Sequence, residues 1–177
     1  MKKIVAFGAS SSSNSINKRL ATYAAQQIQN SNVVILDLNN FEMPIYSEDS
    51  ERLNGIPKEA YDFKEIIKEV DGIIISFAEH NGAYTAAFKN IFDWISRIEK
   101  TVWYNKPMFL MATSPGSNGA SSVLKIAYNR ISGENPYEIP CFSLPNFNIN
   151  FDQQIGIKNK DLNKKFIDAL SIFVDSL

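Results

Sequence analysis

Apolar and polar positions alternate along the chain in blocks that predict strands and helices in turn. Residues 3–8 (KIVAFG) and 72–78 (GIIISFA) are apolar runs, typical of strands buried on both faces of a parallel sheet. Further strands are expected at residues 33–38, 107–113 and 141–144. Apolar residues recur at helical spacing in five segments: Ile16, Leu20, Ala24 and Ile28; Ala60, Phe63, Ile67 and Val70; Ala87, Phe88, Ile91, Phe92 and Ile95; Val123, Leu124, Ala127 and Ile131; and Leu162, Phe166, Leu170, Phe173 and Leu177.

A strand followed by a helix, five times over, predicts an α/β fold with a parallel sheet. Right-handed crossovers make it a three-layer sandwich with helices on both faces. Five strands favour the flavodoxin-like order 2-1-3-4-5 over the six-stranded Rossmann order. We find no repeat or domain boundary, so residues 1–177 are expected to form one domain. Residues 39–57 read as irregular, and their length favours a functional or interface loop.

Composition narrows the function classes. A net charge of −1 argues against a nucleic-acid binder and, more weakly, against a strongly acidic electron carrier. With one cysteine and one histidine, a thiolate–imidazole zinc site and an intramolecular disulfide are not expected. No signal peptide is recognised, and the longest apolar run is far below the ~20 residues of a membrane span. The sequence therefore predicts a cytoplasmic protein without a metal.

Three loops should meet at the switch in strand order, where such sheets bind ligands. They are residues 8–17 (GASSSSNSIN), 78–85 (AEHNGAYT) and 114–120 (SPGSNGA). The first leads into a helix N-terminus, which attracts anions. Its serines and asparagines also suit plain N-capping, but a cap needs only one of them. We therefore favour a phosphate site.

Other chemistries find little support in the residues. The sequence has no G-x-G-x-x-G after the first strand, no P-loop and no G-x-S-x-G elbow. The first strand ends without the acidic residues of a receiver domain. His80 reads as a surface-loop residue, Tyr84 could stack on a flat ring, Asp93 reads as a solvated helix charge, and Trp94 reads as core or dimer packing. The third loop reads as an ordinary turn and cap.

The loops resemble those of the NAD(P)H-dependent FMN reductase family, which includes related quinone and chromate reductases. The family pattern G-G-S-x-R-x-x-S-x-N lies over residues 8–17, where Ser10, Ser15 and Asn17 match and Ser12 replaces the usual Arg. The pattern P-E-Y-N-G-S, followed by L-K-N-x-x-D-W, lies over residues 78–94, with His80 in place of Tyr and Ala78 in place of Pro. Residues 43–46 (MPIY) are similar to the family's L-P-x-Y.

The resemblance implies FMN at the switch point. Its phosphate would lie on Ser10, Ser12, Ser15, Ile16 and Asn17, and its ring would lie between Glu79, His80, Asn81 and Gly82 on one side and Ser114, Gly116, Ser117 and Asn118 on the other. NAD(P)H would pass a hydride to FMN N5, and an acceptor such as a flavin or quinone would then take two electrons, by double displacement. No catalytic side chain is implied. Family members form dimers or tetramers, often through the helix at residues 89–94, so a homodimer or homotetramer is expected.

Two alternatives remain open from the sequence. The first is a flavodoxin-like electron carrier without NAD(P)H activity, although the near-neutral charge and the lack of T-x-T-G-x-T favour the reductase. The second is a flavin-free structural or regulatory protein, because Ser12 forgoes a charged hydrogen bond worth about 1.5–3 kcal/mol. Neutral hydroxyls and backbone N–H groups still suit a phosphate, so we expect FMN to bind.

Overall fold

The centre of the molecule is a parallel sheet of five strands. The computed structural model describes residues 1–133 and 135–177. The strands lie in the order β2-β1-β3-β6-β7. Their bounds are β1 (Lys2–Ala9), β2 (Ser31–Leu36), β3 (Gly72–Phe77), β6 (Met108–Thr113) and β7 (Cys141–Leu144). Counted along the sheet strands alone, this is the predicted order 2-1-3-4-5, so the flavodoxin-like fold is confirmed.

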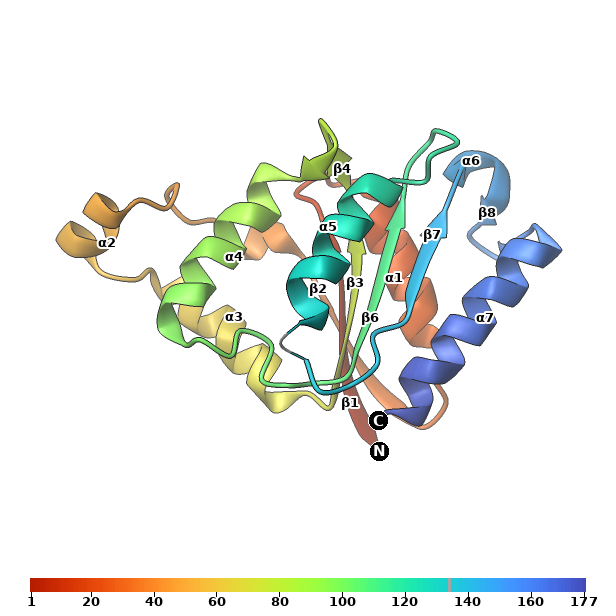
Figure 1. Ribbon diagram of the computed structural model, residues 1–177, viewed down its shortest axis with the longest axis horizontal. Coiled ribbons are helices and arrows are strands. Elements are labelled where there is room, and N and C mark those ends of the chain that lie inside the picture. The colour runs from red at the N-terminus through yellow and green to blue at the C-terminus, as the bar shows by residue number, and fades with distance from the viewer. Residues whose placement is uncertain (134) are drawn as a thin grey trace.

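Helices cover both faces of the sheet (Figure 1). One face carries α1 (Ile16–Gln26) and α7 (Lys160–Asp175), and the other carries α3 (Lys58–Glu69), α4 (Ala86–Ile98) and α5 (Ser121–Ser132). Strand β1 contributes side chains to the core on both faces of the sheet. Ile4 and Ala6 pack under α1 and α7, whereas Val5 and Phe7 pack under α3 to α5. All four side chains are fully buried, which explains why the apolar run has no polar interruption.

Several short elements lie outside the sequence prediction. They are the 3₁₀ helix η1 (Leu38–Phe41), α2 (Glu48–Asn54), α6 (Phe147–Asn150) and two hairpins, β4 (Glu79–His80) with β5 (Ala83–Tyr84) and β8 (Phe151–Asp152) with β9 (Gly156–Ile157). Strand β2 also begins and ends two residues before the predicted 33–38. Its end is set by Asp37, whose side chain accepts the Asn39 N–H and caps η1.

The region predicted as irregular, residues 39–57, carries the helix α2 on a projecting arm (Figure 1). The Ser47 side chain caps this helix, and Glu48, Asp49 and Glu51 lie in its first turn. No residue of α2 is buried. Local capping and charge therefore form this helix without a packed face. Among the described residues, no helix has the length and apolarity to cross a membrane.

Candidate functional site

The loop between β1 and α1 begins where strand and helix nearly touch. A Cβ at Gly8 would overlap the backbone nitrogen of Lys18 and lie 2.8 Å from its Cα, so only glycine allows this approach. Beyond it the chain folds on itself. Ser10 N–H donates to Gly8 O at 2.8 Å, and Ser12 N–H donates to Ser10 Oγ at 3.1 Å. The N-terminus of α1 is thereby fixed at the carboxyl end of β1.

The serines of this loop divide into supporting and exposed groups. Ser10 and Ser15 are buried, and Ser15 Oγ caps α1 by accepting the Lys18 N–H at 3.1 Å. Residues 11–14 are exposed. Within the described chain, the N–H groups of Ser11, Ser13 and Asn14 have no hydrogen-bond partner. The first turn of a helix leaves further N–H groups unpaired. One serine therefore serves as the cap, and the rest of the loop presents neutral donors.

Asn17 lies beneath the loop and is almost fully buried, at 2% exposure. Its Oδ1 accepts from Ser76 Oγ at 2.7 Å and from Thr113 N–H at 3.0 Å, while its Nδ2 donates to Thr113 O at 3.1 Å. The amide thus joins α1 to the carboxyl ends of β3 and β6. In the sequence, the only sign of this brace is a polar residue near the end of each of two apolar strands, β3 and β6.

The positive charge nearest this loop in the sequence is already paired. Lys18 Nζ lies 2.7 Å from Asp37 Oδ2, after β2. The hydrogen bond from Lys18, with one from the Asn39 backbone, holds the pKa of Asp37 below its usual value. The loop therefore faces an incoming anion mainly with N–H and O–H groups.

The second loop is a β-hairpin rather than the plain lead into a helix that the sequence predicted. His80 pairs with Ala83 across a two-residue turn in which Asn81 has φ 51° and Gly82 has φ 77°. Two positive φ values are the mark of a type I′ turn, for which Asn-Gly is a preferred dipeptide. His80, Asn81 and Gly82 are all exposed. The hairpin presents them at the carboxyl edge of the sheet.

Tyr84 does not offer its ring to a ligand. It packs against Phe77, Phe88 and Phe92, with the Phe88 centroid 5.1 Å away. Its hydroxyl is buried without a hydrogen-bond partner in the described chain. Burial raises the pKa of Tyr84 to about 12. The interpretation of Tyr84 as a stacking residue is therefore wrong, because the hairpin turns the ring into the core.

Two side chains at the base of the hairpin fix it to its neighbours. Glu79 Oε2 accepts the Val123 N–H at the start of α5, at 2.9 Å. Thr85 Oγ1 donates to Ala9 O at 2.9 Å and accepts the Phe88 N–H as the cap of α4. Thr85 was not among the predicted site residues. The sequence feature that could have identified Thr85 as a helix cap is its place directly before a segment with helical apolar spacing.

The third loop is held by its own polar groups and by the segment after β7. Ser114 Oγ donates to Gly116 O at 3.3 Å, and Asn118 Oδ1 accepts from Ser121 Oγ at 2.7 Å. Asn146 N–H donates to Gly116 O, and Phe147 N–H donates to Ser114 O. Ser117 stays exposed. The loop is thus a braced rim beside the hairpin.

Helix α4 explains the motif that follows the hairpin. Asn90 Nδ2 donates to the carbonyls of Met43 and Pro44 at 3.1 Å, and Trp94 Nε1 donates to Pro44 O at 2.7 Å. Trp94 is fully buried, which confirms core packing. Asp93 forms an i,i+4 pair with Lys89, in keeping with its reading as a helix charge. The motif therefore anchors the arm that precedes α2.

Comparisons with known proteins agree with this geometry. Residues 2–133 match the family model of NADPH-dependent FMN reductase. A 2-hydroxy-1,4-benzoquinone reductase from a Burkholderia species is 30% identical over 142 residues, covering 79% of this chain and 74% of that protein. The chain belongs to the NADPH-dependent FMN reductase family. Membership makes it an oxidoreductase with FMN as cofactor and NAD(P)H as electron donor.

More distant relatives extend the agreement over the whole chain. A quinone reductase from Pseudomonas putida is 26% identical over 163 residues, covering 91% of this chain and 84% of that protein. The flavoenzyme NAD(P)H:(acceptor) oxidoreductase FerB from Paracoccus denitrificans superposes with a TM-score of 0.77 at 20% identity, covering 99% of this chain and 97% of that one. At that identity the structural match supports the fold.

The donor set of the serine loop suits the FMN phosphate of this family. The loop places unpaired N–H groups and exposed hydroxyls at a helix N-terminus, which is a ready anion site. Ser11, Ser13 and Asn14 belong to this set although the sequence did not single them out. A depression of about 430 Å³ opens beside Ser11, bounded by the segment before the arm and by α4. Among the described residues, no group of acidic, His and Cys side chains could hold a metal.

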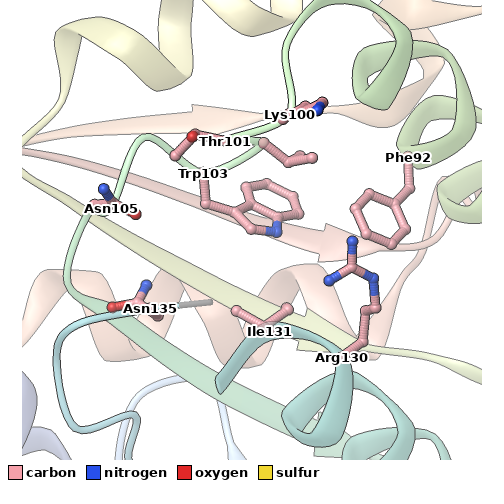
Figure 2. Close-up of a pocket in the computed structure, with 9 residues that line it drawn as sticks. Phe92, Lys100, Thr101, Trp103, Asn105, Arg130, Ile131 and Asn135 are labelled. Atoms are coloured by element: carbon pink, nitrogen blue, oxygen red, sulfur yellow. The ribbon is translucent and has the colours of Figure 1, made fainter. Parts of the chain in front are cut away.

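A second cavity, of about 200 Å³, is remote from these loops. It lies between α4, α5 and the segment leading into β6, toward the amino ends of the strands (Figure 2). Trp103 stacks on Phe92 at 5.9 Å between centroids, and the Arg130 guanidinium lies 5.7 Å from the Phe92 centroid. Because open parallel α/β sheets bind ligands at the carboxyl ends of their strands, this cavity is not part of the candidate site.

Proposed function

We propose that this family member holds FMN across the three loops and passes electrons from NAD(P)H to a quinone or flavin by double displacement. The observation that carries the proposal is the set of unpaired N–H groups at the start of α1, beside the Asn-Gly hairpin and the braced third loop. We further propose that residues 1–177 act as one domain in the cytoplasm.

Each loop has a separate task in this proposal. Ser10, Ser12, Ser15, Ile16 and Asn17, with the N–H groups of the exposed serines, surround the phosphate, and Asn17 does so by fixing the loop from below. The exposed hairpin turn offers backbone groups to one side of the ring, and the rim from Ser114 to Asn118 offers groups to the other. His80 is exposed beside the turn, so we propose that its side chain is open to substrates.

FMN, when bound, supplies the redox chemistry by accepting a hydride and returning two electrons. The chain then needs no general acid or base. The titratable groups in the three loops are Glu79, His80 and Tyr84, and the Tyr84 hydroxyl is buried. Glu79 is engaged with the start of α5. The protein's work is to bind, orient and leave one ring face open for donor and acceptor in turn.

The relatives support the acceptor class. Two of them are named as reductases of quinones and share 26% and 30% identity with this chain. We propose a small quinone or flavin as the acceptor. We also propose a homodimer, supported by the projecting arm, where Ile45 and Leu53 are 86% and 71% exposed. Light scattering coupled to gel filtration tests the homodimer, and a monomer at micromolar concentration contradicts it.

Reconstitution with FMN followed by anaerobic titration tests the function. The apoprotein should become yellow with FMN, and NADPH or NADH should bleach the bound flavin, with a quinone restoring the colour. Initial rates against both substrates should give parallel double-reciprocal lines. FMN binding without bleaching would favour an electron carrier, and no binding would favour a flavin-free protein.

A further inference from the structure

Helix α5 starts without a cap of its own. Its N-cap position is Ala120, in a left-handed conformation (φ 58°), with no side-chain hydrogen bond and no acidic residue in the first turn. Helices α1, α4 and α7 are capped by Ser15, Thr85 and Asn159, respectively. A helix start leaves N–H groups unpaired, and capping them typically stabilises a helix. Helix α5 instead receives a side chain from a distant part of the sequence.

That group is the Glu79 carboxylate, which accepts the Val123 N–H at 2.9 Å across 44 residues of sequence. A negative charge at a helix N-terminus interacts favourably with the helix dipole. Glu79 is the first residue of β4, one residue before His80 and the exposed turn of the hairpin, and it pairs with Tyr84 of β5. Helix α5 directly follows the braced third loop. One carboxylate therefore connects the second loop to the third.

We propose that Glu79 is a positioning residue that locks the β4–β5 hairpin to α5 and so sets the spacing of the two loops that receive the flavin ring. The inference rests on the proposed function for its link to FMN. The link between hairpin and helix stands on the contact alone. Thr85 holds the other end of the hairpin to Ala9 O. With the Glu79 side chain removed, the hairpin keeps its hydrogen bond to β1 and loses its hydrogen bond to α5.

The variants separate a coupling role from ordinary capping. Glu79→Ala removes the contact, whereas Glu79→Gln keeps an uncharged acceptor in the same place. Ser122→Asp puts a charge into the first turn of α5 without reaching the hairpin, since Ser122 is exposed and bonded only to Asn118 in the described chain. The double variant Glu79→Ala/Ser122→Asp thus restores the helix charge but not the connection. Ser122→Asp alone is the matched control.

Hydrogen exchange in the apoprotein provides the first readout and needs no flavin. Amides of residues 79–84 should exchange about tenfold faster in Glu79→Ala and in the double variant than in the wild type or the control. Unchanged exchange in Glu79→Ala would overturn the proposal, and so would exchange returned to the wild-type rate by Ser122→Asp. This readout stays decisive if the wild type fails to bind FMN, a result that would refute the proposed function separately.

FMN affinity, measured by quenching of flavin fluorescence, provides the second readout. Glu79→Ala should raise the FMN Kd about tenfold, and Glu79→Gln should recover most of that loss. The double variant should regain thermal stability while its Kd stays high. A double variant that regains both stability and affinity would show that Glu79 is only a helix cap.

Discussion

The buried amide of Asn17 allows a quantitative test of what this residue does. Asn17→Ala removes three hydrogen bonds and leaves the C=O of Thr113 without its amide donor at a site that is 1% exposed. An unsatisfied buried group costs about 1–3 kcal/mol, and the lost bond from Ser76 adds about 1 kcal/mol. We therefore expect the apoprotein to lose about 2–4 kcal/mol of unfolding free energy. A residue that only contacts phosphate would leave the apoprotein unchanged.

Urea unfolding of the apoprotein measures this loss. Asn14→Ala is the matched control, since Asn14 is an exposed amide of the same loop and its loss should cost less than about 0.5 kcal/mol. Ser76→Ala should cost about 1 kcal/mol alone and little more in the Asn17→Ala background, because the two share one bond. A loss below about 1 kcal/mol for Asn17→Ala, or strict additivity with Ser76→Ala, would refute the bracing role.

Four further predictions follow from single contacts. Tyr84→Phe removes a buried hydroxyl that has no partner among the described residues, and it should stabilise the protein by about 1 kcal/mol in thermal or urea unfolding; destabilisation would mean that the hydroxyl has a partner. Gly8→Ala forces α1 away from β1 and should cost about 3 kcal/mol in unfolding free energy while weakening FMN binding; unchanged values would contradict the close approach. Ser12→Arg adds a charge to a neutral loop and should tighten FMN binding about tenfold by fluorescence titration, and an unchanged Kd would mean that the neutral donors suffice. Lys64 is 1% exposed, and burial lowers its pKa in the folded protein below the ordinary 10.5. Between the lowered pKa and 10.5, the unfolded chain therefore binds more protons than the folded one. The contribution of Lys64 to the free energy of unfolding should then rise as the pH rises toward 10.5. Unfolding measured as a function of pH should show the stability of the wild type rising relative to that of Lys64→Met in that range. A stability difference that does not change with pH would contradict the lowered pKa.

The sheet could be predicted because its strands are buried on both faces. Nearly every position of β1 and β3 is buried, and apart from Ser76 the buried positions carry glycine or an apolar side chain, so the runs stand out in the sequence. The strand order then followed from the number of strands and the handedness of the crossovers. The strand order in turn predicted which loops meet at the carboxyl edge of the sheet.

The hairpin was missed because each of its strands has only two residues, too few for a period of two to appear. The Asn81-Gly82 dipeptide was the available signal. Helix α2 was missed because it has no buried residue and therefore shows no apolar periodicity. The available signal was Ser47 followed by three acidic residues, which mark the start of a helix. Local turn and cap chemistry would have found both elements where hydrophobic patterning could not.

Long-range polar contacts were beyond the sequence because pairing depends on the folded backbone. Asn17 meets Thr113 across 96 residues, and Glu79 meets Val123 across 44. Both residues were read as ligand contacts from the family pattern, and both have side chains engaged within the protein. In this site the matched motif residues hold the loops in shape, while exposed backbone N–H groups of Ser11, Ser13 and Asn14 remain for an anion. Because buried contacts beneath the loop set its shape, the fold does not depend on which side chains the loop exposes. This is the physical reason that the fold tolerates Ser12 at the position where the family usually has Arg.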